Sequence, residues 1–121
     1  MQNKKKILFI NPPGKKIYIR DYYCSKVSKA YYLPQPVDLL IQSSFFDENF
    51  YELKVIDCIA EKIDISQALL KVKTFNPDFV IGLIGSVSLP EDVTFYAKLK
   101  SNHPYIKILA SGDALLEEYQ E

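Results

Sequence analysis

The feature that most constrains the fold is a short apolar run near the N-terminus, residues 6–10 (Lys-Ile-Leu-Phe-Ile), which stops at a polar residue and a Pro-Pro-Gly turn. Large apolar residues in unbroken succession, ended by such a turn, are typical of a strand that is buried on both faces. We therefore expect residues 6–10 to form a central strand. In a parallel sheet, ligands bind outside the carboxyl ends of the strands, so residues 11–14 are expected at the ligand edge.

Strand and helix patterns alternate along the rest of the chain. Further strands are predicted at residues 52–57, 79–84 and 106–110, and helices are predicted to begin after Pro36, at Ile65 and after Ser88, with a last short helix at 114–120. In the first of these helices, one face is expected to lie in the core, formed by Val37, Leu40, Ile41, Ser44 and Phe45. This alternation predicts a single doubly wound α/β domain over residues 1–121, with helices on both faces of a parallel sheet and right-handed crossovers. Counted over these four strands, the expected order is 2-1-3-4.

The fourth predicted strand, 106–110, is left as an exposed edge in this arrangement. A domain of this kind normally continues with a fifth strand and helix. We therefore expect the chain to be the N-terminal fragment of a longer protein, truncated before that strand, or to form a homo-oligomer that covers the edge.

Three local signals refine the prediction. Asp64 with Gln67, and Ser88 with Glu91, have the spacing of helix capping boxes. Gly82, in the middle of the third strand, indicates the close approach of a backbone or a ligand.

Charge and composition argue against several classes of protein. Fifteen basic and fifteen acidic side chains cancel, so no net positive charge attracts nucleic acid or an anionic membrane. No apolar run approaches the roughly 20 residues of a membrane span, and the N-terminus lacks a signal-peptide core. We expect a cytoplasmic protein with no nucleic-acid and no membrane partner.

Cysteine and histidine are too sparse to suggest a metal centre. Cys24 and Cys58 are the two cysteines, and Cys58 is expected to pack at a strand end as a reduced thiol. His103 precedes the fourth strand, at the opposite end of the sheet from the ligand edge. It is expected to be a helix-terminus residue.

The segment between Lys15 and Gln35 shows no clear periodicity but is rich in tyrosine. Its tyrosines are Tyr18, Tyr22, Tyr23, Tyr31 and Tyr32. A loop of this length inside a compact domain is usually functional. These rings could lie against a flat ligand or hold the loop to the body of the domain.

Three loops rich in small residues are expected to meet at the ligand edge. Their candidate binding residues are Asn11, Pro12, Pro13, Gly14, Gly85, Ser86, Ser88, Ser111, Gly112 and Asp113. The loops contain no general base, no nucleophile–histidine pair and no set of carboxylates for a metal, so we predict a binding crevice without catalytic residues or metal ligands. Helix N-termini pointing into the same space favour a ligand with phosphate or amide groups.

The same residues also have structural interpretations. Ser88 and Asp113 could be helix N-caps, Gly112 could serve a tight turn, and residues 11–13 could simply end a strand. A nicotinamide site and a P-loop are disfavoured because only one glycine, Gly14, follows the first strand.

Several longer motifs point to a family. They are residues 6–14 (Lys-Ile-Leu-Phe-Ile-Asn-Pro-Pro-Gly), 33–40 (Leu-Pro-Gln-Pro-Val-Asp-Leu-Leu), 55–57 (Val-Ile-Asp), 75–82 (Phe-Asn-Pro-Asp-Phe-Val-Ile-Gly) and 106–112 (Ile-Lys-Ile-Leu-Ala-Ser-Gly). Together they resemble the N-terminal cobalamin-binding domain of radical SAM enzymes, a family that includes magnesium-protoporphyrin IX monomethyl ester cyclase and methyltransferase-like proteins. The resemblance covers nearly the whole chain.

The resemblance implies a flavodoxin-like domain that holds cobalamin, with the nucleotide tail of the cofactor entering between the first and third strands. By position, Ser86 and Ser88 match the family's serine/threonine loop. Ser111 and Gly112 match its Gly-Gly pair, with one glycine replaced by serine. The Asp-x-His-x-x-Gly motif is absent, so a bound cobalamin would lack a protein histidine on cobalt.

The Cys-x-x-x-Cys-x-x-Cys motif of the radical SAM cluster is also absent from the chain. S-adenosylmethionine and the iron–sulfur cluster would therefore belong to a C-terminal radical SAM domain after residue 121, and this chain alone would not be catalytic. The resemblance, together with the small-residue loops at the ligand edge, implies a cobalamin-binding module that holds the corrinoid for such a domain. The alternative is a degenerate scaffold or interaction domain of the same fold, and a third class is a small-molecule or nucleotide-sugar enzyme.

Overall fold

The computed structural model describes residues 4–20, 25–28 and 37–113 of the chain. Several predictions fall outside these residues. They concern Cys24, Tyr22, Tyr23, Tyr31, Tyr32 and the last helix at 114–120.

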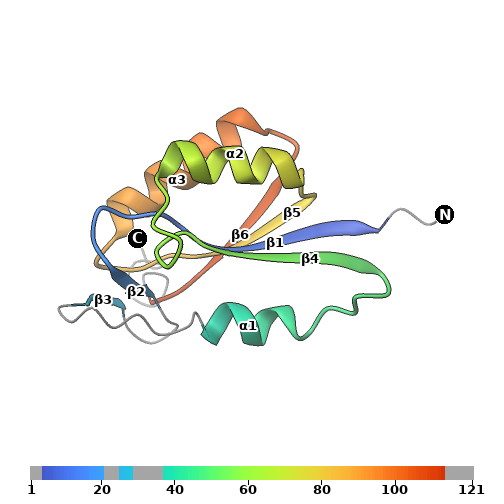
Figure 1. The fold of residues 1–121 in the computed structure, drawn as a ribbon, viewed down its shortest axis with the longest axis horizontal. Helices are drawn as coiled ribbons and strands as arrows, with labels where there is room; N and C mark the ends of the chain where they lie inside the picture. The colour runs from blue at the N-terminus through green and yellow to red at the C-terminus, as the bar shows by residue number, and fades with distance from the viewer. Residues whose placement is uncertain (1–3, 21–24, 29–36, 114–121) are drawn as a thin grey trace, which may run out of the picture.

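The core of the fold is a parallel sheet of four strands, β1 (Lys5–Asn11), β4 (Tyr51–Asp57), β5 (Phe79–Leu83) and β6 (Lys107–Ser111). Figure 1 shows these strands running side by side in the order β4-β1-β5-β6. In the register, Phe9 of β1 lies opposite Val55 of β4 and Ile81 of β5. The prediction of an α/β domain with a parallel sheet is confirmed.

The expected order 2-1-3-4 was based on four predicted strands, whereas the described residues form six strands. The two additional strands, β2 (Tyr18–Arg20) and β3 (Ser25–Val27), form a separate antiparallel pair. Each has three residues, too few for an alternating pattern to be visible in the sequence. The neighbours expected for β1, namely 52–57 and 79–84, are the strands with which it pairs.

Helices cover both faces of the sheet, as predicted (Figure 1). α2 (Ile65–Phe75) and α3 (Leu89–Asn102) pack on one face, and α1 (Val37–Ser43) contacts the other. Alternate residues of β1 supply both interfaces, since Leu8 and Ile10 belong to the α2–α3 core and Ile7 and Phe9 to the α1 core. This double burial explains why β1 needs consecutive apolar residues.

α1 is shorter than its periodic pattern predicted. The helix ends at Ser43, so Ser44 and Phe45 lie in a turn and Phe45 is 80 % exposed. The next residue, Phe46, packs on the core instead, with its ring centroid 5.8 Å from that of Phe9. Leu40 and Ile41 are exposed as well, at 41 % and 52 %, whereas Leu39 is buried, so the predicted placement of Leu40, Ile41 and Phe45 in the core was wrong.

The ends of α2 follow the predicted chemistry. The Asp64 carboxylate accepts a hydrogen bond from the backbone amide of Gln67, and the Gln67 side-chain carbonyl accepts one from the backbone amide of Asp64. Asn76 ends α2 in a left-handed conformation. His103 is the C-cap of α3, which confirms its expected position at a helix terminus.

The close approach predicted at Gly82 is made by a side chain. The Tyr96 hydroxyl donates a hydrogen bond to the Leu83 carbonyl at 2.6 Å, and a Cβ on residue 82 would lie 2.0 Å from that hydroxyl. Gly82 therefore leaves space for Tyr96 to lie against the sheet.

Cys58 follows β4 and is buried as a free thiol, as expected. Burial, aided by the nearby Glu61 and Asp57 carboxylates, raises the pKa of this thiol to about 12. The thiol is therefore protonated and unreactive at neutral pH.

No helix in the described ranges is both long enough and apolar enough to cross a membrane.

Candidate functional site

The three loops expected at the ligand edge do meet. The Ile84 amide, just after β5, donates a hydrogen bond to the Ser111 carbonyl, and the Ser86 amide donates one to the Asp113 carboxylate, both at 2.9 Å. The loop after β1 is joined to the loop after β5 by a side chain that the sequence analysis did not select, that of Arg20 in β2.

The Arg20 guanidinium occupies the space between the ends of β1 and β5. Its Nη1 donates hydrogen bonds to Asn11 Oδ1 and to the Pro12 carbonyl, each at 2.9 Å. Its Nε donates to Ser88 Oγ at 3.1 Å. Its Nη2 lies 2.7 Å from Asp92 Oδ1 in an ion pair whose side chains are both 0 % exposed. Arg20 thus links the end of β1 to the first turn of α3 inside the protein.

Both carboxylate oxygens of Asp92 accept hydrogen bonds. Besides the two contacts from Arg20, its Oδ2 accepts hydrogen bonds from Ser88 Oγ at 2.7 Å and from the Gly85 amide at 2.9 Å. A buried ion pair compensates for its lost hydration only when the remaining donors and acceptors are bonded in this way. The arrangement is therefore a complete internal network.

The positions of Arg20 and Asp92 follow from two local patterns. Alternation along β2 turns Tyr18 and Arg20 to the same, buried side. The first turn of α3 presents two consecutive carboxylates, Glu91 and Asp92. The Tyr18 hydroxyl donates to Glu91 Oε1 at 2.7 Å, so β2 meets the start of α3 through two adjacent pairs.

The contacts of β2 with the start of α3 replace the capping box predicted for this helix. Ser88 is the N-cap residue, but its side chain makes no capping hydrogen bond, because its oxygen accepts from Arg20 Nε and its hydroxyl donates to Asp92. Glu91 does not reach back to Ser88 either, since its two oxygens accept from Tyr18 and from the Lys15 amide. The capping-box prediction was therefore wrong.

The Tyr18–Glu91 pair makes stability depend on pH. Burial alone would raise the pKa of Glu91, but the hydrogen bonds from Tyr18 and Lys15 outweigh it and hold this pKa below its usual value of 4.5. The hydrogen bond to Glu91, followed by burial, raises the pKa of Tyr18 to about 12. Ionised Glu91 with protonated Tyr18 is therefore the pair that the fold prefers.

Replacing Glu91 by glutamine is expected to flatten the acid limb of the stability curve. The carboxylate stabilises the fold above its unfolded pKa, and this contribution disappears as the pH falls through the lowered folded pKa. Glutamine does not titrate, so urea unfolding measured between about pH 5 and pH 3 should show a smaller loss of free energy for Glu91→Gln than for the wild type. An unchanged acid slope would show that Glu91 is not held as described.

Seven of the ten predicted binding residues are buried, and Gly14, Ser86 and Ser111 are half-buried. Asn11 donates from Nδ2 to Asp57 Oδ1 at 2.9 Å and accepts from Arg20. The Ser111 hydroxyl accepts from Gln42 Nε2 at 2.9 Å. These predicted binding residues therefore hold the domain together.

The structure explains why residue 112 is a glycine. Its φ is +154°, and a Cβ at this position would lie 1.8 Å from the Ile84 carbonyl oxygen. Gly112 thus allows the end of β6 to touch the backbone after β5. This backbone contact by itself accounts for a glycine at position 112.

Two of the predicted residues, Pro13 and Gly14, border a hollow among the described residues. A hollow of about 570 Å³ lies between the loop after β1 and the first turns of α2 and α3. It is lined by Pro13, Gly14, Lys15, Asp64, Ile65, Ser66, Pro90, Glu91 and Thr94. Its proline and isoleucine side chains make it largely apolar.

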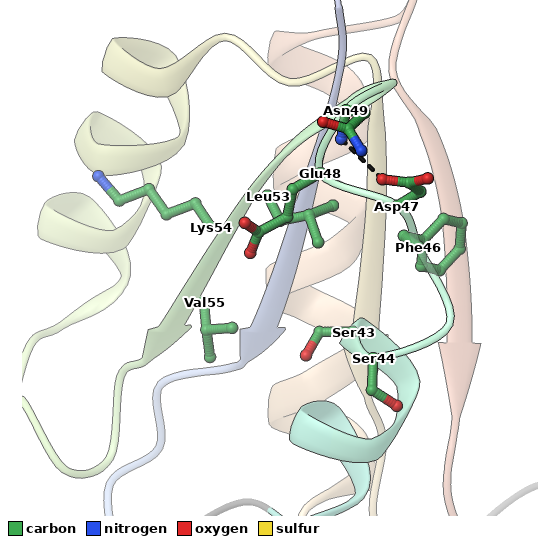
Figure 2. Close-up of a pocket in the computed structure, with 9 residues that line it drawn as sticks. All are labelled: Ser43, Ser44, Phe46, Asp47, Glu48, Asn49, Leu53, Lys54 and Val55. Atoms are coloured by element: carbon green, nitrogen blue, oxygen red, sulfur yellow. Dashed lines mark hydrogen bonds between the residues drawn. The ribbon is translucent and has the colours of Figure 1, made fainter.

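A second hollow, of about 650 Å³, lies over β4 on the side of α1 (Figure 2). Figure 2 shows the Asp47 carboxylate accepting a hydrogen bond from the backbone amide of Asn49, with Glu48, Ser43 and Ser44 around the opening. None of the predicted binding residues lines it.

In the ranges that the structure describes, no group of three or more His, Cys, Asp and Glu side chains is placed to hold a metal ion.

One sequence signal could have indicated Arg20. It is the only arginine in the chain, where all other basic residues are lysines. Arginine stays charged when buried, and its planar fork matches a carboxylate, so a lone arginine among lysines favours a buried pair. Its partner could not be identified, because Asp92 lies 72 residues away.

Compared with known proteins, the chain matches no family model, no curated protein and no solved structure.

Proposed function

We propose that this chain is a flavodoxin-like domain of the kind that precedes radical SAM enzymes, in which the cobalamin crevice is closed and the domain serves as a scaffold for a catalytic partner. The partner would be a radical SAM domain that carries S-adenosylmethionine and the iron–sulfur cluster. One observation carries the proposal: the fully buried Arg20 side chain between the ends of β1 and β5.

The physical argument concerns what a cofactor tail would have to displace. In the family that the sequence resembles, the tail enters between the first and third strands, which correspond here to β1 and β5. That path is occupied by the Arg20–Asp92 pair and by its hydrogen bonds to Asn11 and Ser88. Leaving one member of a buried pair without its partner costs about 3–5 kcal/mol, so the occupied crevice disfavours entry of the tail.

A corrinoid holder is the second candidate, and the apolar hollow beside Pro13 and Gly14 favours it. A hollow of about 570 Å³ is within the range of small-molecule sites. It borders the same edge of the sheet, at the first turns of α2 and α3. A corrinoid bound there would sit beside the occupied crevice.

Titration with hydroxocobalamin distinguishes the two candidates. We expect the wild-type chain to show no saturable change in corrin absorbance and no rise in melting temperature, up to millimolar hydroxocobalamin. The absence of both supports a closed crevice. Saturable binding would overturn the scaffold proposal.

Two threonine variants locate any binding that is seen. Thr94 lines the hollow and Thr74 does not, yet both are exposed helix residues whose hydroxyls donate to the carbonyl four residues earlier. Binding that is weakened by Thr94→Trp and unaffected by Thr74→Trp would place the corrinoid in the hollow. Binding unaffected by either variant would place it elsewhere and contradict both candidates.

A further inference from the structure

We propose that the outer edge of β4 pairs with the same edge of a second copy of this chain, antiparallel and about a two-fold axis at Leu53. Among the described residues, β4 pairs with β1 alone, so its other edge carries unpaired backbone groups. The chain is described without a gap from residue 37 to residue 113, so both connections to β4 are seen and neither pairs with that edge. This inference does not depend on whether the domain binds a corrinoid.

The charged side chains of β4 indicate what the partner is. Glu52 and Lys54 are exposed and lie on the α2 side of the sheet, since Ile56, which has the same parity, belongs to the α2–α3 core. The Lys54 ammonium lies 5.7 Å from the centre of the Phe75 ring in α2. Within the described residues, neither Glu52 nor Lys54 forms an ion pair. An acidic and a basic residue two positions apart make a strand complementary to its own antiparallel copy.

The backbone of β4 presents its free groups at three residues. The Cys58 amide, directly after the strand, donates to the Asn11 carbonyl and so points toward β1. Backbone groups of successive strand residues point in opposite directions, so Tyr51, Leu53 and Val55 present theirs to the open edge. All seven residues of β4 pair one-to-one with β1, and none is proline. Neither a bulge nor a missing donor therefore interrupts this edge.

An antiparallel pair centred on Leu53 uses all these groups. Leu53 exchanges two hydrogen bonds with its counterpart, and Tyr51 does so with Val55 of the second copy. Between them, Glu52 lies opposite Lys54 of the second copy, in the closely spaced position where facing side chains touch. The two-fold axis repeats this contact, so the edge forms two ion pairs between the copies.

The other face of the same register is apolar. Tyr51 and Leu53 pack on the α1 core, and Val55 is 39 % exposed on that side. The register places the Tyr51 ring beside Val55 of the second copy, and aromatic side chains opposite β-branched ones stabilise antiparallel pairs. The hollow of about 650 Å³ over β4 borders Leu53 and Val55, which leaves room for the side chains of a second strand (Figure 2).

The neighbouring registers bring like charges together. An axis through Glu52 sets two carboxylates against each other, and an axis through Lys54 sets two ammonium groups against each other. An axis between two residues does not occur, because facing residues must point to the same side of the sheet. Charged side chains normally keep edge strands apart, whereas these two favour one arrangement, the antiparallel pair centred on Leu53.

The first test is the mass of the chain in solution, measured by sedimentation or light scattering up to millimolar concentration. We expect a monomer–dimer equilibrium that weakens as salt is added, because the two ion pairs lie at an exposed edge. A chain that stays monomeric throughout would overturn the proposal, and so would open-ended growth beyond a dimer.

A charge exchange tests the register. Lys54→Glu sets a carboxylate opposite Glu52 twice in the dimer, and should raise the dissociation constant at least about tenfold. Combining Lys54→Glu with Glu52→Lys reverses both charges and should restore the dimer. Lys98→Glu is the matched control, since it makes the same change of charge at an exposed position on α3. It should leave the dissociation constant nearly unchanged, because salt screens charges that are far apart.

Recovery in the double variant is the decisive result. General effects on net charge or folding would not be reversed by a second substitution at Glu52, whereas facing charges would. A dimer that Lys54→Glu affects no more than Lys98→Glu would overturn the proposal. A dimer that Lys54→Glu weakens, and that Glu52→Lys does not restore, would overturn the register and with it the proposed pairing.

Discussion

Replacing Arg20 by alanine is expected to lower the free energy of unfolding by about 3–5 kcal/mol. The substitution leaves the Asp92 carboxylate buried without its charged partner. It also removes the hydrogen bonds that Arg20 donates to Ser88, Asn11 and the Pro12 carbonyl. A loss of this size is a large fraction of the roughly 5–15 kcal/mol that stabilises a typical domain. Urea unfolding followed by circular dichroism measures it directly.

Two comparisons show whether the effect comes from the unpaired charge. The double variant Arg20→Met and Asp92→Leu replaces the pair by apolar side chains, and should recover much of the loss because no charge is then left without a partner. Lys26→Ala removes an exposed positive charge from β3 and should change the free energy by less than about 0.5 kcal/mol. If Arg20→Ala were no more harmful than Lys26→Ala, the buried network would not stabilise the domain as described.

Replacing Gly112 by alanine is expected to lower the free energy of unfolding by at least about 2 kcal/mol. Its φ of +154° is unfavourable for any residue with a side chain, and the added methyl group would meet the Ile84 carbonyl at 1.8 Å. The atom in contact is backbone, which cannot rotate away as a side chain could. The strain should therefore fall on the contact between β5 and the end of β6.

Ser111→Ala is the neighbouring control for the glycine variant. It deletes the hydroxyl that accepts from Gln42, a loss of about 0.5–1.5 kcal/mol, without changing the backbone. Equal stability of the two variants in the same urea titration would show that residue 112 tolerates a side chain, and the structural role assigned to this glycine would be wrong.

The parts of the fold that were predictable are those with a local cause. The apolar run of β1 requires burial on both faces, and the structure buries Leu8 and Phe9 on opposite sides of the sheet. The Asp64–Gln67 capping box is complete within one helical turn, so no distant residue was needed to predict it. Both features are determined by residues close together in the sequence.

The candidate site was less predictable because its contacts are distant in sequence. Ser88 and Glu91 have the spacing of a capping box, yet distant partners divert both side chains: Arg20 donates a hydrogen bond to Ser88, and Tyr18 donates one to Glu91. Gly112 was selected as a candidate binding residue or a turn glycine, whereas the atom that requires a glycine there belongs to Ile84, far away in the chain. Small residues at a sheet edge can thus reflect internal packing as readily as a ligand.

The separation between Arg20 and Asp92 also has a consequence for the order in which the chain folds. Their contact spans 72 residues, a segment that contains β4, α2 and β5. The entropy of closing so long a loop is not offset by one ion pair, but it is greatly reduced once the parallel sheet has brought the two ends together. We therefore expect the arginine to enter its position after the central strands have paired, so that the link between β1 and α3 forms late in folding.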